Sequence, residues 1–569
     1  ERGSIMDLDM YQRCAQYTKG EVPAQIVFKN AKIVNVFTGE IITGDIAVAE
    51  GIIVGIGEYK GLVEKDMTGK YICPGFIDAH LHLESTLLTP AELVSAASRC
   101  GTTTFIADPH ESANVSGLAG VDYILQQTEN CRANVYVMMP SCVPATAVDD
   151  NGCTITAEEM KPYLQNKRIL GLGEVMDYVS VVCSDPEMHK KLHLFERRIR
   201  DGHAPDLSDS DLQAYAMAGI ETEHEASTFE YAMKERRNGM TILIREGSAA
   251  RNVEAIVKGI VENGISTEGF CFCTDDKHIQ DILQEGHIDH NVRKSIRLGL
   301  DPMTAIQMAT IHPAKCYGLK DVGAIAPGYQ ADLIVLDDLN TIQVEEVYYK
   351  GEKIQKSETV EKAECPKELK NTVHIKDFSK NRLRLPLTNE THVIELVDGQ
   401  ILTKDKKIRT EAGTEFQADR EYQKIAVVER HKGTGKVGVG IVGGYGIKHG
   451  AIASSVSHDS HNIIVVGDND EDMELAVNEL IKSQGGYSVV SDHEVFDTLP
   501  LPIMGLMSDD GFQEIDSKMK RMKQKAQEMG VSKGIDPFIT LSFMALTVIP
   551  EIRITPRGVY CVKENTFYK

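Results

Sequence analysis

The sequence predicts a mixed α/β protein: a (β/α)8 barrel of the TIM type, a small β-sheet domain and a separate C-terminal α/β domain. Three observations predict this fold class. Apolar runs typical of strands recur through the middle of the chain and alternate with helical patterns. Two stretches of short alternating strands flank that middle segment. A stretch rich in Lys and Glu, with little periodicity, then separates it from another mixed region.

The barrel is expected in the central segment, residues 71–316. Alternation of strands and helices implies a parallel sheet, and the number of runs over this length fits a closed (β/α)8 barrel. The fifth run is the weakest of the eight, because its approach is too charged for an ordinary buried strand. The expected strands are 71–78, 102–108, 134–140, 169–174, 199–203, 219–224, 240–245 and 269–275.

The other domains follow from the remaining patterns. The two β-rich stretches alternate apolar and polar residues between turn glycines, so we expect them to close one small sheet from both ends of the barrel segment. The expected divisions are an N-terminal helix or arm at 1–22, a composite β-sheet domain at 23–70 and 317–356, a linker at 357–385 and a C-terminal α/β domain at 386–569.

The composition excludes several classes of function. The 569-residue chain has a formal net charge of −23, whereas a protein that binds duplex nucleic acid needs a basic face. No apolar run approaches the roughly 18 residues of a membrane span, and the first twenty residues lack the apolar stretch of a signal peptide. We therefore expect a cytoplasmic enzyme with a small neutral substrate, no nucleic-acid or membrane partner, and a homo-oligomeric state, with a dimer favoured.

Histidine and acidic side chains follow most of the predicted strands at one end. That end is the face of a barrel where active sites lie. His80 and His82 are two residues apart, so an extended chain presents both imidazoles on one face, where they can share a divalent ion. A lone histidine at a strand end is more often a packed residue, but the joint pattern favours a metal centre over a polar barrel mouth. The residues are His80, His82, Asp108, His110, Glu174, His203, His224 and Asp275.

Several strings of residues carry a resemblance to a known family. The string Pro74-Gly-Phe-Ile-Asp-Ala-His-Leu-His82 resembles the entry motif of the amidohydrolase superfamily. The chain resembles the adenine deaminase family in particular, and the resemblance covers nearly its whole length. It departs from the family pattern at Arg200, where an apolar residue is expected. The supporting strings include Ala107-Asp-Pro-His-Glu111, Asp201-Gly-His-Ala-Pro-Asp206, Arg245-Glu-Gly-Ser-Ala-Ala-Arg-Asn252 and Ser455-Val-Ser-His-Asp-Ser-His461.

The resemblance implies a binuclear metal site. One metal would be held by His80, His82, Glu174 and Asp275, and the other by Glu174, His203 and His224. This set exceeds the three protein ligands of a usual catalytic zinc. Where many barrels of this type place a carbamylated lysine, this chain has Glu174. A bridging carboxylate favours Mn²⁺ or Fe²⁺ over Zn²⁺.

The resemblance also implies a reaction. A hydroxide held by both metals would attack C6 of adenine, with Asp275 accepting its proton, and the products would be hypoxanthine and ammonia, as in purine salvage. The leading candidates for reading the purine are Arg245, Glu246 and Ser248, although the first two could instead form an ion pair. The alternative candidates are Glu84, Ser85 and Glu111.

Two further motifs leave alternatives open. Asp108 and His110 could form an extra metal site, position the substrate, or orient the histidine ligands. His458 and His461 could cover the barrel mouth as a lid or form a hydrogen-bonded turn. For the whole chain, the alternatives to adenine deamination are hydrolysis of a cyclic amide, as by a hydantoinase-like enzyme, and a non-catalytic scaffold.

Overall fold

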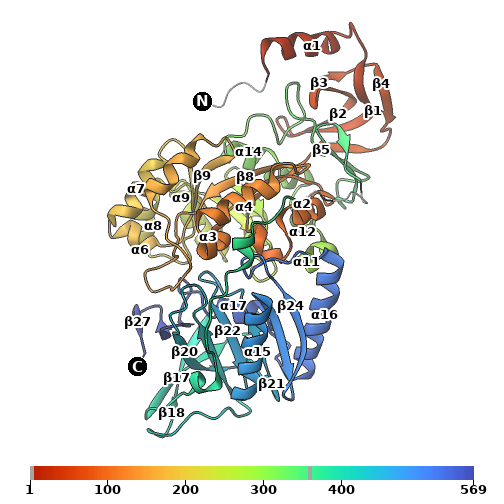
Figure 1. The fold of residues 1–569 in the computed structure, drawn as a ribbon. Coiled ribbons are helices and arrows are strands. Elements are labelled where there is room, and N and C mark those ends of the chain that lie inside the picture. The colour runs from red at the N-terminus through yellow and green to blue at the C-terminus, as the bar shows by residue number, and fades with distance from the viewer. Residues whose placement is uncertain (1–5, 356–359, 361, 569) are drawn as a thin grey trace.

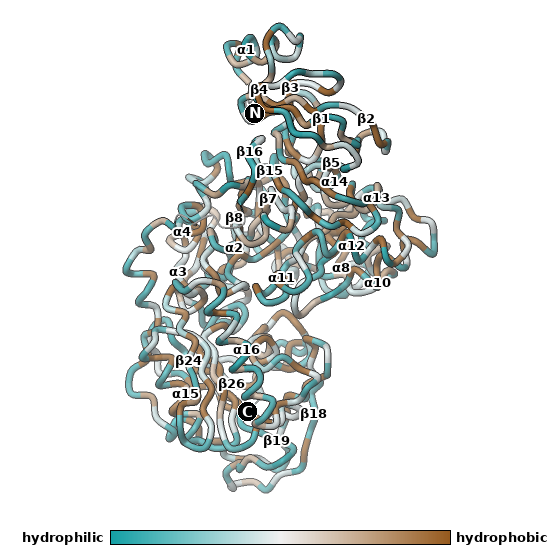
Figure 2. The backbone as a smooth tube through the Cα atoms, turned by 90° about the vertical axis from the view of Figure 1, so that its right-hand side faces the viewer, coloured by the Kyte–Doolittle hydropathy of each residue, from teal (hydrophilic) through white to brown (hydrophobic). Residues whose placement is uncertain are grey.

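The structure, a computed structural model, describes residues 6–355, 360 and 362–568. The first five residues of the expected N-terminal arm, and residues 357–359 and 361 of the expected linker, lie outside the described residues. The small sheet domain and the C-terminal domain lie on opposite sides of a central barrel (Figure 1). The same order is visible after a quarter turn, with hydrophobic runs along the strands of each part (Figure 2).

The small domain is a sheet assembled from both flanks of the barrel segment. Its strand order is β16-β15-β14-β5-β1-β2-β3, with β4 paired to β1. Helix α1 (Leu8–Thr18) packs beside it through the buried Cys14. The strands are β1 (Ala24–Asn35), β2 (Glu40–Ala49), β3 (Ile52–Gly57), β4 (Gly61–Asp66), β5 (Tyr71–Pro74), β14 (Leu333–Leu336), β15 (Val344–Tyr349) and β16 (Glu352–Lys353).

The strand predicted at 71–78 is divided between two domains. Strand β5 pairs with β1 and β14 in the small sheet, and the first barrel strand begins at Phe76. The division falls at Gly75, whose N–H donates to the carbonyl of Asp332 (2.9 Å). A Cβ at Gly75 would lie 2.0 Å from Thr103 Oγ1, so only glycine allows this close crossing from sheet to barrel.

The barrel has eight parallel strands in two hydrogen-bonded arcs, β6 to β10 and β11 to β13. One seam is joined by Glu221 N–H donating to the Arg200 carbonyl (2.9 Å), and the other by Asp275 N–H donating to the His80 carbonyl (2.9 Å). The strands are β6 (Phe76–Leu81), β7 (Thr102–Ala107), β8 (Asn134–Met139), β9 (Ile169–Val175), β10 (Ile199–Gly202), β11 (Thr222–Glu223), β12 (Thr241–Arg245) and β13 (Phe270–Cys273).

The charged fifth strand is accommodated by alternation. Ile199 joins the buried cluster that includes Ile77, Ile106 and Met138. The next residue, Arg200, instead pairs with the exposed Glu221, with 3.8 Å between Arg200 Nη2 and Glu221 Oε1.

Helices surround the strands. They are α2 (Pro90–Ser98), α3 (His110–Ser116), α4 (Leu118–Thr128), α5 (Ala157–Met160), α6 (Tyr178–Val182), α7 (Pro186–Leu194), α8 (Asp209–Met217), α9 (Phe229–Arg237), α10 (Val253–Asn263), α11 (Ile279–Glu285), α12 (Ile288–Arg297), α13 (Pro302–Met308) and α14 (Ile311–Cys316).

The C-terminal domain is an eight-stranded sheet with helices and a separate three-stranded sheet. The larger sheet has the order β18-β17-β20-β19-β22-β21-β23-β24. Its strands are β17 (Glu390–Leu396), β18 (Thr403–Arg409), β19 (Tyr422–Val428), β20 (Val437–Gly443), β21 (Gly450–Ser454), β22 (Ile463–Gly467), β23 (Gly486–Ser491) and β24 (Glu494–Pro500). The remaining elements are α15 (Asp470–Ser483), α16 (Phe512–Glu528), α17 (Ile539–Phe543), β25 (Ile552–Thr555), β26 (Gly558–Cys561) and β27 (Thr566–Phe567).

The described part of the expected linker is packed and not extended into solvent. Short 3-10 turns at Lys367–Lys370 and Lys380–Leu383 bury Leu369 and Leu383, and His374 N–H donates to the Arg430 carbonyl (2.7 Å). Apolar residues spaced among the lysines anchor this segment to the C-terminal domain. Within the described residues, no helix is both long and apolar enough to span a bilayer.

Candidate metal centre

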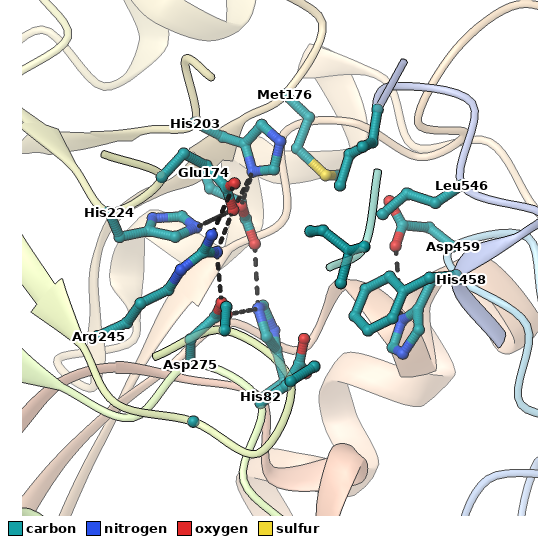
Figure 3. A pocket seen from close by; sticks show the side chains of 18 of the residues that line it. His82, Glu174, Met176, His203, His224, Arg245, Asp275, His458, Asp459 and Leu546 are labelled. Atoms are coloured by element: carbon teal, nitrogen blue, oxygen red, sulfur yellow. Dashed lines mark hydrogen bonds and ion pairs between the residues drawn. The ribbon is translucent and has the colours of Figure 1, made fainter. Parts of the chain in front are cut away.

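Six side chains with metal-binding groups meet at the carboxyl ends of the barrel strands. They come from strands or segments far apart in the sequence, and all are buried. Figure 3 shows five of them around one pocket; His80 lies against the same carboxylates. The six are His80, His82, Glu174, His203, His224 and Asp275, the residues that the sequence singles out.

The carboxylate of Glu174 lies at the centre of this group, and its two oxygens face different histidines. Oε1 is 3.1 Å from His82 Nε2 and 3.6 Å from His80 Nε2. Oε2 is 2.8 Å from His203 Nδ1 and 3.1 Å from His224 Nε2. This arrangement suits a carboxylate that bridges two cations.

Backbone contacts hold Glu174 in this position. Its N–H donates to Asp108 Oδ2 (2.8 Å), and its carbonyl accepts from Ser141 Oγ (2.7 Å). The preceding Gly173 permits the approach of Asp108, because a Cβ there would lie 2.4 Å from the same Oδ2. The carboxylate of Asp108 therefore positions Glu174 by accepting a hydrogen bond from the backbone N–H of Glu174.

Hydrogen bonding fixes which nitrogen of His82 faces the site. His82 Nδ1 donates to the carbonyl of Asp108 (2.8 Å). The neutral ring therefore carries its proton on Nδ1 and directs a free lone pair on Nε2 toward Glu174 and toward Asp275 Oδ1, which is 3.2 Å away. This tautomer is the one that a metal ligand requires.

Asp275 closes the group from the eighth strand. Its φ of 60° lies in the left-handed region, which aspartate adopts more readily than most residues. Oδ1 is 3.5 Å from His80 Nε2, and Oδ2 accepts from Arg245 Nη1 (2.9 Å). Burial alone would raise the pKa of Asp275, but its contacts with His80 and His82 and the charges of His224 and Arg245 hold that pKa well below its usual value.

Buried nitrogens that lack partners indicate that a cation fits here. Among the described residues, neither His80 Nδ1 nor His80 Nε2 has a hydrogen-bond partner, and the same holds for His203 Nε2 and His224 Nδ1. Unpaired buried polar groups are costly. Nearby sets such as His80, His82 and Asp275, or His80, Glu174 and His224, bring their ligand atoms within 4.8 Å of one another. The residues present fit divalent metal ions.

His110 contacts the centre directly. Its Nδ1 is 3.2 Å from Glu174 Oε1 and 3.5 Å from Asp108 Oδ1, and its Nε2 donates to Glu111 Oε1 (3.0 Å). His82, Asp108 and His110 also form a set that could hold an ion. The geometry thus places Asp108 behind Glu174 and His110 beside it.

The tentative purine-binding residues separate into two groups. Arg245 and Glu111 line the pocket, although Arg245 is committed to Glu225 (2.5 and 3.0 Å) and to Asp275. The sequence pointed to the purine or Glu246 as the partner of Arg245, and not to Glu225. The other four point into separate contacts: Glu246 to Lys294, Ser248 to Asp281, Glu84 to the N–H of Ser112 and Ser85 to Asp276.

The C-terminal domain reaches the same pocket. His458 lines it, and both His458 and His461 contact the carboxylate of Glu111. Asp459 lies between these two histidines, inside the string that the sequence singled out. Sequence reasoning missed the other lining residues of this domain, because nothing in their local pattern indicates that they lie at the mouth of a barrel. They are Ile401, Phe543, Leu546 and Ile549, which join Met176 and Glu225 of the barrel.

A buried glutamate that sequence reasoning also missed connects the loop that follows His203 to the loop that follows His224. Glu223 is fully buried, and its Oε1 accepts from the N–H of Ala204 (3.0 Å) and of Glu225 (2.7 Å). Those residues directly follow His203 and His224. One carboxylate therefore sets the spacing of the two histidines that face Glu174 Oε2. The signal in the sequence was its place one residue before His224.

The barrel and its strand-end residues define an amidohydrolase, and residues 71–374 match the model of the Amidohydrolase family. Residues 400–566 match the model of the Adenine deaminase C-terminal domain. The chain is 54% identical over 552 residues to the adenine deaminase of Desulfitobacterium hafniense (strain Y51), covering 97% of each. It is 45% identical over 557 residues to that of Clostridium acetobutylicum, covering 96% of this chain and 97% of the relative. The chain belongs to the adenine deaminase family.

We expect Glu223→Gln to weaken metal binding about 10- to 100-fold, because it removes the charge that clamps the loops of His203 and His224. Metal titration of the metal-free protein measures this change. Glu221→Gln, at an exposed position just before the same strand, is the matched control and should bind metal normally. Unchanged affinity in Glu223→Gln would contradict the clamp.

Proposed function

We propose that this chain deaminates adenine hydrolytically, giving hypoxanthine and ammonia. The observation that carries the proposal is Glu174, whose two carboxylate oxygens face separate groups of buried histidines in a member of the adenine deaminase family. Adenine is a neutral, planar base with polar edges and apolar faces. Its edges suit the buried charged residues of the pocket, and its faces suit the apolar side.

We assign His80, His82 and Asp275 to one divalent cation, His203 and His224 to a second, and Glu174 to both. A carboxylate bridge in an imidazole and carboxylate site favours Mn²⁺ or Fe²⁺ over Zn²⁺. When bound, two such cations lower the pKa of a shared water toward neutrality and so supply hydroxide at pH 7.

Asp275 is placed to move the protons of the reaction. It is anionic at neutral pH, and Arg245 holds its Oδ2, so the carboxylate can accept a proton from the attacking water beside it. The new bond joins the water oxygen to C6 of adenine, and the bond from C6 to the exocyclic nitrogen breaks. Of the two protons of the water, one ends on N1 of hypoxanthine and the other leaves with ammonia.

The remaining walls of the pocket suit the faces of a purine. Met176 from the barrel, with Ile401 and Leu546 from the C-terminal domain, contributes apolar surface, and Phe543 adds an aromatic ring. Burying the base against these side chains is favourable, and it also excludes bulk water from the charged wall.

The direct test is an assay of the metal-free protein loaded separately with Mn²⁺, Fe²⁺ and Zn²⁺. We expect adenine to be converted to equal amounts of hypoxanthine and ammonia, with the Mn²⁺ or Fe²⁺ form the most active. Chelation should abolish the activity. Hydrolysis of a dihydropyrimidine, combined with no release of ammonia from adenine, would contradict the proposal and favour a cyclic-amide hydrolase.

Glu174→Ala should lose bound metal and activity together, because no other described side chain faces both groups of histidines. Metal content per chain and adenine turnover are the two measurements. The control is Glu429→Ala, which removes a buried glutamate whose oxygens bind N–H groups of its own loop, away from the metal ligands. A Glu174→Ala protein with normal metal content would remove the bridging role.

Asp275→Asn should retain much of its metal while losing turnover by about 10²- to 10⁴-fold, the usual contribution of a general acid or base. The amide keeps the shape and a hydrogen bond to Arg245 but accepts protons poorly. Metal content and the turnover number separate the two effects. Asp281→Asn, which changes the partner of Ser248 outside the pocket, is the control. Near-normal turnover in Asp275→Asn would exclude it from proton transfer.

A further inference from the structure

One buried carboxylate of the pocket has an oxygen without a hydrogen-bond partner among the described residues. Asp459 is 4% exposed and lines the pocket, and its Oδ2 lacks a hydrogen-bond partner among the described residues. Its Oδ1 lies 3.7 Å from His110 Nε2 and 3.7 Å from His458 Nδ1. Both nitrogens make shorter hydrogen bonds to Glu111, at 3.0 and 2.8 Å. The carboxylate of Asp459 therefore retains acceptor capacity.

The turn that carries Asp459 is anchored from several sides. It connects β21 to β22, and its two histidines both bind Glu111 of the barrel. The His458 ring stacks on Phe543, with ring centroids 4.9 Å apart and an interplanar angle of 19°. The carbonyl of Ser460 accepts from His431 Nε2 (2.6 Å). A carboxylate on a turn held in this way is positioned before any ligand arrives.

The same turn is not arranged as another cation site, although Glu111, His458 and His461 lie close enough to hold an ion. The N–H of Ser457 donates to His461 Nδ1 (3.1 Å), so the ring proton of a neutral His461 is on Nε2. That Nε2–H is directed at Glu111. The three side chains form a hydrogen-bonded brace that joins the two domains and holds Asp459.

Asp459 lies across the pocket from the metal-binding wall. Figure 3 shows Asp459 and His458 on the side away from Glu174 and Asp275. A purine that presents C6 to Asp275 directs its N9 edge away from that wall. In the free base, N9 carries a hydrogen, whereas in a nucleoside or an N9-alkyl purine it carries carbon. An ionised carboxylate accepts hydrogen bonds and donates none.

We propose that Asp459, a residue of the C-terminal domain, accepts the N9–H of adenine and so selects the free base over N9-substituted purines. This inference rests on the proposed function, since it assumes that adenine is the substrate. A substrate N–H gives the buried Oδ2 the donor that it lacks among the described residues. A methyl or ribosyl group at N9 removes that donor, adds bulk and leaves the carboxylate unpaired, which is the arrangement that gives strong rejection of analogues.

The test compares adenine with 9-methyladenine in the metal-loaded wild type and in Asp459→Ala. Both compounds keep the exocyclic amine, so ammonia release gives kcat/KM for each. We expect the wild type to prefer adenine strongly. In Asp459→Ala, kcat/KM for adenine should fall about 10- to 100-fold, the range for a hydrogen bond to a charged group, while kcat/KM for 9-methyladenine should not fall. The preference should therefore shrink by at least about 10-fold.

Two further variants keep the proposal falsifiable. Asp459→Asn retains an acceptor of the same shape and should lose less adenine activity than Asp459→Ala. Asp149→Asn is the matched control, because Asp149 is also buried where the barrel meets the C-terminal domain but binds Thr146 and Thr547 outside the pocket. It should leave the preference for adenine unchanged.

The outcomes distinguish this inference from the proposed function. An unchanged preference in Asp459→Ala would overturn the role of Asp459. Loss of stoichiometric metal in Asp459→Ala or Asp459→Asn would also overturn it, by assigning the carboxylate to the metal centre. A wild-type protein that releases no ammonia from adenine would instead contradict the proposed function.

Discussion

The contact between the buried carboxylate of Glu174 and its surrounding imidazoles is the interaction on which the rest of the barrel mouth depends. A carboxylate removed from water costs several kcal/mol unless opposite charge and hydrogen bonds offset the loss. Here Asp108 fixes its backbone, four histidines face its oxygens, and His110 touches it from the side. Burial would raise the pKa of Glu174, but the His224 charge and the contacts of His110 and His203 hold that pKa well below its usual value. The position therefore stays anionic and able to bind cations.

The C-terminal domain is part of this site and not an appendage to it. A chain of contacts leads from Glu174 through His110 to Glu111, and from Glu111 to the two histidines of the β21–β22 turn. The barrel supplies the charged wall, where bonds change, and the C-terminal domain supplies much of the apolar wall. The C-terminal domain covers the charged wall of the barrel, so movement of that domain would expose the charged wall to water.

The sequence located the barrel strands and named the six residues that the structure brings together, because both follow local rules. Strand periodicity locates each run, and the barrel brings every strand end to one face. Tyr71–Pro74 was misplaced because an apolar strand has the same pattern in either sheet, and its partner β14 is more than 250 residues away. The packed linker segment was missed because its few apolar residues are scattered among charges. The role of Glu223 depends on backbone N–H groups and that of Asp459 on a contact between domains, and spacing along the sequence predicts neither role.

Charge accounts for the kind of ligand that this pocket accepts. Six carboxylates line it, from Glu111, Glu174, Glu225, Asp275, Asp276 and Asp459, whereas Arg245 is its one arginine or lysine among the described residues. Arg245 pairs with two of these carboxylates, which leaves a strong excess of negative charge in a region of low dielectric. Two divalent cations at the Glu174 end would bring the lining close to neutrality. A negatively charged substrate would upset that balance, whereas a neutral base keeps it and offers N–H donors to the carboxylates that the metals do not reach.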